Sequence, residues 1–225
     1  MKIAIMQPTF LPWIGYFSMM SEVDKFVLLD DVQFERRSWQ QRNKILTSNG
    51  PIWLTVPVAN KSLRLQQINN VQILYEKDFI KKIIRSIELN YSKAPHYKLY
   101  SKKIYSILEE RPKKLSILTI RLIKEIKKIL EIKTKLILSS EMNINGKREE
   151  RLLNICLSLK AKTYLSPPNS KSYLDQSDIF NKNNIVLEYF NYSHPTYPQL
   201  IKEFQPYISV IDLIFNCGRS SKDYL

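Results

Sequence analysis

The sequence predicts an α/β fold: a parallel sheet with a mostly helical insertion in the middle of the chain. Short apolar runs, typical of buried strands, alternate with helical periodicity over residues 1–31 and again after residue 134. This alternation favours βαβ units, whose strands lie parallel. Residues 77–131 show helical periodicity alone, which predicts the insertion.

The opening of the chain predicts the first βαβ unit. Ile3–Met6 is a short apolar run that Pro8 ends, because proline lacks the N–H that a strand ladder needs. Pro12 can begin a helix without losing a hydrogen bond, and apolar residues recur at helical spacing from Ile14 onward. Phe26–Leu29 is the second apolar run. Strand, helix and strand within about 30 residues form a βαβ unit.

Polar residues follow both of these strands. Gln7 follows the first, and the adjacent acids Asp30 and Asp31 follow the second. The carboxyl ends of parallel strands share one edge of the sheet, and ligands of open α/β sheets bind at that edge. A carboxylate there can act as a base, accept a sugar hydroxyl or bind Mg²⁺. The alternative is that one of these acids caps a helix or a turn.

The same patterns predict the remaining elements. Strands are expected at residues 52–57, 71–74, 135–138, 163–165 and 185–189. Helices are expected at residues 79–91, 99–108, 115–129, 148–159, 177–183 and 208–215. The first three of these helices make up the expected insertion, residues 77–131, within a single α/β domain of residues 1–225.

Composition limits the class of protein. No apolar run approaches the roughly 18 residues of a membrane helix, and the N-terminus leads into a short strand rather than a signal peptide. We therefore expect a cytoplasmic protein. Two cysteines, Cys156 and Cys217, are too few for a disulfide scaffold or a zinc site, so we expect no metal. Cys156 lies in an apolar helical pattern and is expected to be a buried thiol.

The net charge of +14 predicts an anionic partner. Nucleic acid, a phosphate-bearing metabolite, an acidic protein and a membrane surface all satisfy that prediction. The alternative is that the charge has no partner, because many lysines fall in helical segments such as FIKKIIRSI and LIKEIKKIL, where they form a solvated face. Charge by itself leaves the partner open.

Arg36, Trp39, Arg42 and Asn43 form the most ligand-like group in the sequence. Arginine pairs with phosphate through two hydrogen bonds, and an indole can stack on a nucleotide base or on the face of a sugar. The alternative is an arginine in a surface salt bridge beside a tryptophan of the core.

Several segments resemble one family. The stretches MQPTFLPWIGYF, VDKFVLLDDVQFERRSW and RN resemble the opening of the WbqC-like family of bacterial proteins. SHPTYPQ and a terminal motif with Ser209, Asp212 and Asn216 also resemble it. The resemblance implies a role in making surface polysaccharide such as the O-antigen of lipopolysaccharide. Taken with the arguments above, it marks these substrate-binding candidates: Gln7, Trp13, Gly15, Tyr16, Arg36, Trp39, Arg42, Asn43, Ser166, Asp212 and Asn216.

Two of the matched segments contain His194 and Ser166, and the sequence offers an argument for and against a functional role of each. His194 follows the strand expected at residues 185–189 and is a candidate general base near neutral pH. A hydrogen-bonded structural histidine is the alternative. Ser166 follows the strand expected at residues 163–165, but Pro167-Pro168 stand where the family usually has glycine. That difference argues against a close approach of this backbone to a ligand.

The opening unit also resembles that of Rossmann-like nucleotidyltransferases, in which a His-x-Gly-His loop opens the helix. Here Trp13-Ile14-Gly15-Tyr16 keeps the glycine and has aromatic residues in place of the histidines. Neutral aromatic rings cannot supply the positive charge that stabilises a triphosphate, so we expect a nucleotidyltransferase-like sheet without that chemistry. The four glycines form no GxGxxG or Walker loop, which excludes a glycine-rich phosphate cradle.

The favoured hypothesis is a transferase that acylates the amine of a nucleotide-linked amino sugar. The arginines at 36 and 42 would hold the diphosphate, and an indole, Trp39 or Trp13, would stack on the base or sugar. His194 or an acid of the Asp30-Asp31 pair would take the amine proton. The expected donor is an acyl thioester on coenzyme A or on an acidic acyl carrier protein. The alternatives are a nucleic-acid-binding protein and a non-catalytic scaffold of a polysaccharide assembly.

Overall fold

A computed structural model describes residues 1–59 and 65–225, and these residues form two compact units. Unit 1 contains residues 1–7, 19–31 and 133–193, and unit 2 contains residues 8–18, 32–132 and 194–225. Helix α1 (Ile14–Ser21) carries the chain from unit 2 back into unit 1. The expected insertion, residues 77–131, lies within unit 2.

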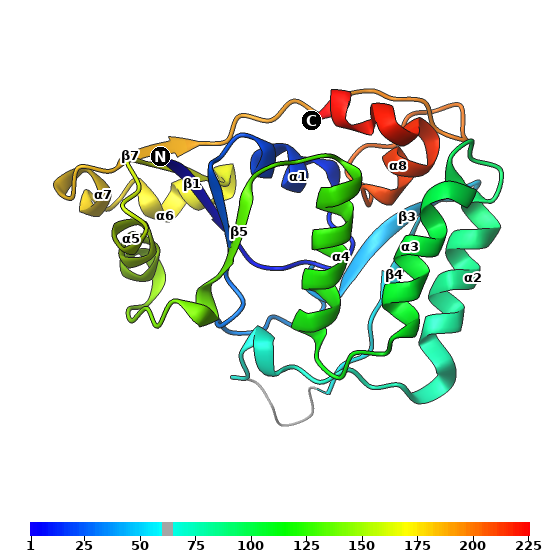
Figure 1. Ribbon diagram of the computed structural model, residues 1–225, viewed down its shortest axis with the longest axis horizontal. Helices are drawn as coiled ribbons and strands as arrows, with labels where there is room; N and C mark the ends of the chain where they lie inside the picture. The colour runs from blue at the N-terminus through cyan, green and yellow to red at the C-terminus, as the bar shows by residue number, and fades with distance from the viewer. Residues whose placement is uncertain (60–64) are drawn as a thin grey trace. The chain divides into compact units, whose positions relative to one another are not determined.

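Within the described residues, unit 1 is built on a five-stranded sheet whose neighbouring strands are all parallel (Figure 1). Its strands are β1 (Lys2–Met6), β2 (Lys25–Leu28), β5 (Lys135–Leu138), β6 (Thr163–Ser166) and β7 (Val186–Tyr189). Their spatial order is β5-β2-β1-β6-β7. β1 and β2 are almost fully buried, which explains their apolar runs. The predicted Rossmann-like α/β fold is confirmed.

The strand order places a reversal between β1 and β6. From β1 the chain adds β2 and then β5 on one side, and it adds β6 and β7 on the other side. Ligands of such sheets bind at the carboxyl ends of the strands where the order reverses. Gln7 directly follows β1 and Ser166 ends β6, so both residues lie at this position of unit 1.

The core of unit 1 joins the sheet to short helices. These are α5 (Arg148–Ser158), α6 (Lys171–Leu174) and α7 (Ile179–Lys182), with 3-10 turns at Ser139–Glu141 and Pro168–Ser170. Ile5, Val27, Ile155 and Phe180 are members of this core. Cys156 is also buried there, as its apolar pattern predicted, and burial raises the pKa of its thiol to about 12.

Unit 2 combines a β-hairpin with amphipathic helices. The hairpin pairs β3 (Arg42–Thr47) antiparallel with β4 (Gly50–Thr55). The helices are α2 (Phe79–Tyr91), α3 (Tyr97–Glu109), α4 (Leu115–Ile129) and α8 (Ile211–Cys217), with 3-10 turns at Ile68–Asn70, Glu76–Asp78 and Gly218–Tyr224. Across the described parts of both units, no helix is both long enough and apolar enough to cross a membrane.

The hairpin corrects the layout expected for residues 40–75. The sequence predicts one strand at residues 52–57, whereas the structure pairs β4 with β3, a strand that the pattern does not reveal. β3 is hidden because its only consecutive apolar pair is Ile45-Leu46, and charged side chains precede that pair. The strand expected at residues 71–74 is wrong, because the described residues there make only isolated bridges, such as Val58 with Ile73.

Candidate functional site

The structure divides the predicted site residues between the two units. Unit 1 holds Gln7, Asp30, Asp31 and Ser166. Unit 2 holds Trp13, Gly15, Tyr16, Arg36, Trp39, Arg42, Asn43, His194, Asp212 and Asn216. The larger group comes from the opening loop, the hairpin and the C-terminal segment, which are distant in sequence. The two groups differ in how their polar atoms are used.

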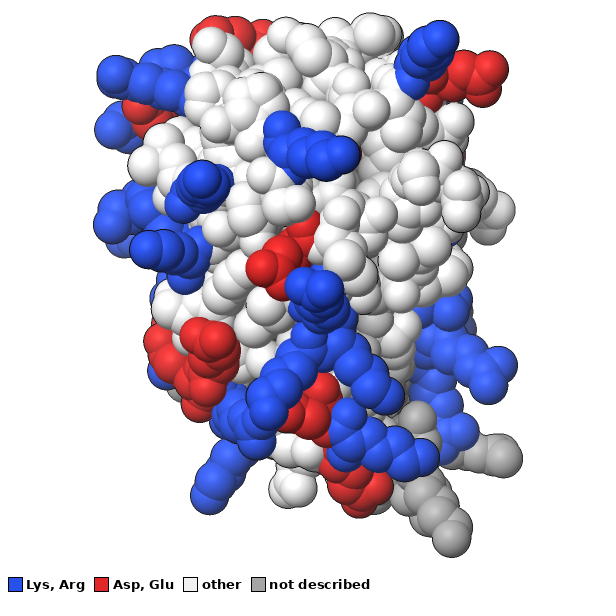
Figure 2. All heavy atoms as spheres, turned by 90° about the vertical axis from the view of Figure 1, so that its right-hand side faces the viewer, with Lys and Arg blue, Asp and Glu red and all other residues white. Residues whose placement is uncertain are grey.

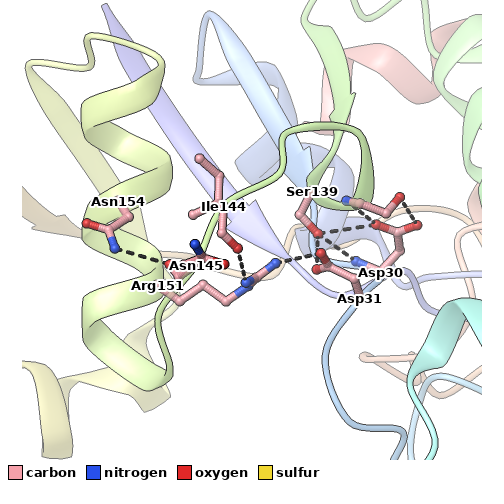
Figure 3. A network of polar contacts seen from close by, with 8 residues as sticks. Asp30, Asp31, Ser139, Ile144, Asn145, Arg151 and Asn154 are labelled. Atoms are coloured by element: carbon pink, nitrogen blue, oxygen red, sulfur yellow. Dashed lines mark hydrogen bonds and ion pairs between the residues drawn. The ribbon is translucent and has the colours of Figure 1, made fainter.

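Asp30 is buried at the carboxyl end of β2, and the turn after β5 holds its carboxylate (Figure 3). Its Oδ1 accepts the backbone N–H of Ser140 at 3.0 Å, and its Oδ2 accepts the Ser140 hydroxyl at 2.8 Å. The Asp30 N–H donates to Ser139 Oγ at 3.1 Å. Asp30 therefore fixes the start of the 3-10 turn Ser139–Glu141, although the N-cap residue of that turn is Leu138. A proton-transfer role for Asp30 stays a prediction.

Asp31 extends this network to helix α5 (Figure 3). Its Oδ1 accepts the Ser139 hydroxyl at 2.6 Å, and its Oδ2 accepts Arg151 Nη2 at 2.5 Å. The side chains of Arg151 and Asp31 are only 14% and 17% exposed. Arg151 Nη1 also donates to the carbonyl oxygen of Ile144 at 2.5 Å. The network thus fastens β2, the turn after β5 and α5 together, through hydrogen bonds strengthened by charge.

In the described part of the chain, the two acids do not belong to a group of side chains placed to hold a metal ion. Among the described residues, no set of three or more His, Cys, Asp or Glu side chains is placed to hold one. Within the network of Asp30 and Asp31, the buried Nε of Arg151 is the atom left without a hydrogen-bond partner in the described part of the chain. All four carboxylate oxygens accept hydrogen bonds. The arrangement is that of a structural network.

Ser166 is fully buried at the end of β6, and neighbouring hydroxyls surround it. Its Oγ lies 2.6 Å from Ser170 Oγ and 3.2 Å from Tyr164 Oη. Ser170 donates in turn to the carbonyl oxygen of Pro167 at 2.6 Å. The serine hydroxyl therefore helps to fold the Pro167-Pro168 loop, and its role toward a substrate, like that of half-buried Gln7, stays a prediction.

Asn43 braces the opening loop of the chain. Its Nδ2 donates to the carbonyl oxygens of Phe10 at 3.3 Å and Leu11 at 2.6 Å. Its Oδ1 accepts the backbone N–H of Lys44 at 2.7 Å. Leu11 has a φ of 44°, a left-handed conformation that is uncommon for a bulky residue, so the brace holds a loop that is costly to form. Asn43 is buried, and it positions the loop.

Gly15 is required by the indole of Trp13. A Cβ atom at residue 15 would lie 2.3 Å from the Trp13 ring, closer than any van der Waals contact allows. The close neighbour of Gly15 is thus the Trp13 indole, and a substrate-binding role for Gly15 stays a prediction. Tyr16 is buried, and burial raises the pKa of its hydroxyl well above the usual value. The WIGY segment therefore shapes unit 2 through its rings.

Trp39, Arg42, Lys44 and Trp53 form an aromatic–basic surface on the hairpin and the turn before it. The two indoles are 48% and 41% exposed, and their ring centroids lie 5.2 Å apart. The guanidinium carbon of Arg42 lies 4.2 Å from the centre of the Trp53 ring, and Lys44 Nζ lies 5.0 Å from it. The exposure excludes the core alternative for Trp39.

Among the residues that the structure describes, the two cations of the aromatic–basic surface have no carboxylate partner. Neither Arg42 nor Lys44 makes an ion pair with an acidic side chain in the described part of the chain. The Nε of Arg42 is buried and lacks a hydrogen-bond partner among the same residues. Arg36 is exposed on the preceding turn. Positive charge beside exposed indoles is suited to a phosphate attached to a flat ring.

His194 lies among aromatic rings of unit 2. Its ring stacks at 6.3 Å from that of Trp13 and meets the ring of Tyr207 edge-on at 5.0 Å. Its Nε2 accepts the backbone N–H of Tyr207 at 3.1 Å, so its Nδ1 carries the proton and donates to the carbonyl oxygen of Pro195 at 2.9 Å. Burial lowers the pKa of this imidazole, which keeps it neutral. Both ring nitrogens thus take part in hydrogen bonds within the protein. The role of His194 as a base stays a prediction.

Asp212 is the most unusual polar residue of unit 2. It lies on α8 with 0% of its surface exposed. Its Oδ2 accepts Gln199 Nε2 at 2.9 Å, whereas its buried Oδ1 accepts no hydrogen bond from the described residues. Burial raises the pKa of this carboxyl to about 6, although Gln199 and the nearby hydroxyls of Tyr91 and Tyr197 oppose the effect. Such a group marks a candidate functional site.

Two further residues of the C-terminal segment hold Asp212 in place. Gln199 uses its other amide atom as well, since its Oε1 accepts the backbone N–H of Gln205 at 2.8 Å. Asn216 donates from Nδ2 to the backbone carbonyl oxygen of Asp212 at 2.8 Å. Ser209 donates its own N–H to the carbonyl oxygen of Lys44 at 2.9 Å and so ties this segment to β3. The matched motifs SHPTYPQ and Ser209–Asn216 thus meet at one carboxylate.

A cavity of about 280 Å³ opens beside Asp212 within unit 2. β3 and the turn after it supply Leu46 and Thr47, and the end of α2 supplies Asn90 and Tyr91. Its volume lies just below the ~300–1,000 Å³ usual for small-molecule sites. The cavity can hold a group of the size of one sugar ring.

Sequence reasoning missed Trp53, Tyr91 and Gln199 as site residues. Trp53 is misread because a tryptophan in an apolar run is usually buried, whereas this one points outward from a hairpin. Tyr91 ends an amphipathic helix, where a buried tyrosine is ordinary. Gln199 ends the matched segment SHPTYPQ, and that resemblance is the signal that could have identified it as a site residue. Their common role is visible only once the cavity and the hairpin are formed.

Comparisons with known proteins give a consistent result. The family model for the WbqC-like protein family matches residues 7–224 of the chain. The chain is 38% identical over 226 residues to an uncharacterized protein of Mycobacterium tuberculosis, Rv1507c, and the match covers 100% of this chain and 97% of that protein. No solved structure matches the chain significantly.

Proposed function

The chain belongs to the WbqC-like family, which is associated with polysaccharide biosynthesis, and from that premise we propose that it transfers an acyl group to the amine of a nucleotide-linked amino sugar. The observation that carries the proposal is the aromatic–basic surface on the hairpin. Two exposed indoles, with two cations that have no carboxylate partner among the described residues, offer both kinds of contact that a nucleotide diphosphate needs.

In this scheme Trp39 or Trp53 stacks on the base. Arg42 and Arg36 bind the diphosphate, and Lys44 can also bind it. The Arg42 guanidinium already lies over an indole, so it is oriented before the ligand arrives, which reduces the entropy lost on binding. Trp13 is a weaker stacking candidate, because Gly15 and His194 already pack against its ring. The base thus lies on the hairpin rather than on the opening loop.

The reaction joins the sugar amine to an acyl thioester carried by coenzyme A or by an acyl carrier protein. The amine lone pair attacks the thioester carbonyl carbon, a C–N bond forms, the C–S bond breaks and the thiol leaves with a proton. One further proton must leave the ammonium form of the amine before attack. His194, Asp30 and Asp31 are the proposed acceptors from the sequence, although hydrogen bonds within the protein already engage each of them.

A mass-spectrometric assay tests this function. The protein is incubated with UDP- and dTDP-linked amino sugars, each with acyl-coenzyme A or acyl carrier protein thioesters. We expect the nucleotide sugar to gain the mass of one acyl group while an equal amount of thiol appears. The same sugar with its amine acetylated beforehand is the control and should not react. No mass change with any donor, from a protein shown to be folded, would contradict the proposal.

Nucleic-acid binding is the second candidate, because exposed indoles beside cations also stack on single-stranded bases. Against it, the basic charge is not gathered into one uninterrupted patch on the face drawn in Figure 2, where acidic side chains lie between the basic ones. Several of the unit 2 cations form ion pairs, including Lys81 with Asp78, Arg85 with Glu88 and Arg111 with Asp78. Binding to random-sequence RNA or DNA that persists at about 150 mM salt would favour this candidate.

A further inference from the structure

The carboxylate of Asp212 is an incomplete ion pair. A buried carboxylate without a cation is costly, and proteins keep such groups when another requirement demands them. Asp212 is 0% exposed, its Oδ2 accepts Gln199 Nε2, and the hydroxyls of Tyr91 and Tyr197 lie close to the carboxylate. In the described part of the chain no Lys, Arg or His side chain pairs with it, and Oδ1 accepts nothing.

The groups around Asp212 leave its negative charge in place. The hydroxyls of Tyr91 and Tyr197 are neutral donors, and their own pKa values are raised well above the usual range by burial and by this carboxylate. Burial, and to a smaller extent the charge of Asp212, raises the pKa of the Cys217 thiol, so that thiol is protonated as well. Lys93 lines the same cavity but is exposed. The site therefore has one negative charge and a cavity open beside it.

The cavity limits what can neutralise that charge. Only one carboxylate oxygen is unused, which suits the compact ammonium group, whereas a guanidinium fork prefers two oxygens. Among the described residues no set of three or more metal-binding side chains is present, so a metal ion lacks the other ligands that it needs. The remaining walls mix apolar Leu46 and Ile201 with polar Thr47 and Asn90. This mixture is suited to the faces and hydroxyls of one sugar ring.

We propose that this cavity is an ammonium-binding site that takes the protonated amine of an amino sugar, with Asp212 Oδ1 as its counter-ion. The choice of an amino sugar among amines rests on the proposed function, whereas the site itself rests on the cavity and its unpaired carboxylate. A hydroxyl in the same place would leave the buried charge unneutralised, so the site selects the amine over the alcohol or amide.

The hairpin connects this cavity with the aromatic–basic surface. β3 contributes Arg42 and Lys44 to that surface and Leu46 and Thr47 to the cavity wall. Four residues of an extended strand span about 13 Å. A nucleotide-linked sugar can therefore have its base and diphosphate on the hairpin surface while its amine reaches Asp212. The cavity, at about 280 Å³, holds the sugar alone and leaves the nucleotide outside.

Binding of free sugars tests the site without nucleotide or acyl donor. Glucosamine and N-acetylglucosamine are titrated into the full chain at pH 7.5 by ligand-observed NMR. We expect glucosamine to bind at least about tenfold more tightly, and Asp212→Asn to abolish that preference. Asp178→Asn, which removes a charge from an exposed acid of unit 1, is the matched control and should keep it. Equal binding of the two sugars to the native chain would overturn the proposal.

Two further measurements test the same site: the pH dependence of sugar binding and the effect of Lys93→Ala. The native protein should lose its preference for glucosamine between pH 7 and pH 5, because a carboxyl whose pKa is about 6 becomes neutral over that range. Lys93→Ala tests whether Lys93 neutralises Asp212 in the free protein. If it does, the variant would bind glucosamine more tightly than the native chain.

If the amine preference is present but no acyl transfer occurs with any nucleotide sugar, the site stands and the proposed reaction fails. If acyl transfer occurs but the amine preference is absent, the proposed reaction stands and the proposed site is overturned.

Discussion

The acidic network of unit 1 and the single acid of unit 2 use the same chemical group in opposite ways. Every carboxylate oxygen of Asp30 and Asp31 accepts a hydrogen bond, from serines and from an arginine. Asp212 is more deeply buried than Asp31, yet one of its oxygens accepts none from the described residues. The first pattern stabilises a fold, and the second lowers its stability. Stability can therefore distinguish structural acids from those kept for a ligand.

The largest expected effect comes from breaking the satisfied network. Arg151→Ala leaves Asp31 largely buried without its cation, so we expect the free energy of unfolding to fall by about 3–5 kcal/mol. Urea denaturation measures this loss. Arg148→Ala, which removes an exposed arginine from the same helix, is the matched control and should cost much less. A loss below about 1 kcal/mol for Arg151→Ala would mean that the network does not hold unit 1 together.

Arg42 should behave in the opposite way. Its cation has no carboxylate partner among the described residues, so Arg42→Ala removes little that stabilises the fold. If it binds phosphate, the variant should weaken binding of UDP- or dTDP-linked sugars by about 1.5–3 kcal/mol, with little change in melting temperature. Calorimetric titration and a thermal melt measure the two effects. A large fall in stability with unchanged binding would make Arg42 a structural residue like Arg151.

Gly15 tests whether the aromatic rings of unit 2 tolerate crowding. Gly15→Val places carbon atoms where the Trp13 indole lies, since even a Cβ would be 2.3 Å from that ring. Overpacking of this kind costs about 1–3 kcal/mol. We expect lower stability and, because Trp13 stacks on His194, a changed tryptophan fluorescence spectrum. Native stability in the variant would show that the indole has another position available.

The smallest effect is expected from Tyr16→Phe, which removes one buried hydroxyl. Tyr16 is almost completely buried among the rings of unit 2, so the loss of its hydroxyl should act on packing more than on binding. We expect a stability loss of about 0.5–1.5 kcal/mol and unchanged binding of nucleotide sugars. Loss of binding in a stable Tyr16→Phe protein would place the ligand against the opening loop and contradict the assignment of the base to the hairpin.

The strands of unit 1 were predictable because parallel strands buried on both faces are continuous apolar runs. Ile3–Met6 and Phe26–Leu29 are such runs, and they correspond to β1 and β2. The hairpin was not predictable in the same way. β3 begins with Arg42, Asn43 and Lys44, whose side chains bind and brace rather than pack, so the local pattern lacks the alternation of a strand.

The site was harder to predict than the fold because its contacts depend on tertiary structure. Asp212 meets Gln199 across an irregular segment with no periodicity, and no local pattern shows that one of its oxygens is left unpaired. Resemblance to a family marks Asp212, whereas their position after a predicted strand marks Asp30 and Asp31. Only the hydrogen-bond partners reveal that those two are occupied.

The pH dependence of stability tests the unpaired charge of Asp212 most directly. The folded-state pKa of about 6 lies above the ordinary value of 3.8, so ionising this carboxyl destabilises the fold, from about pH 4 upward and fully above pH 6. A pKa difference of about two corresponds to about 3 kcal/mol. Asp212→Asn should therefore match the native protein at pH 4 and exceed its unfolding free energy by about 3 kcal/mol at pH 7–8. Asp30→Asn should be less stable throughout, and the same behaviour in Asp212→Asn would contradict the account.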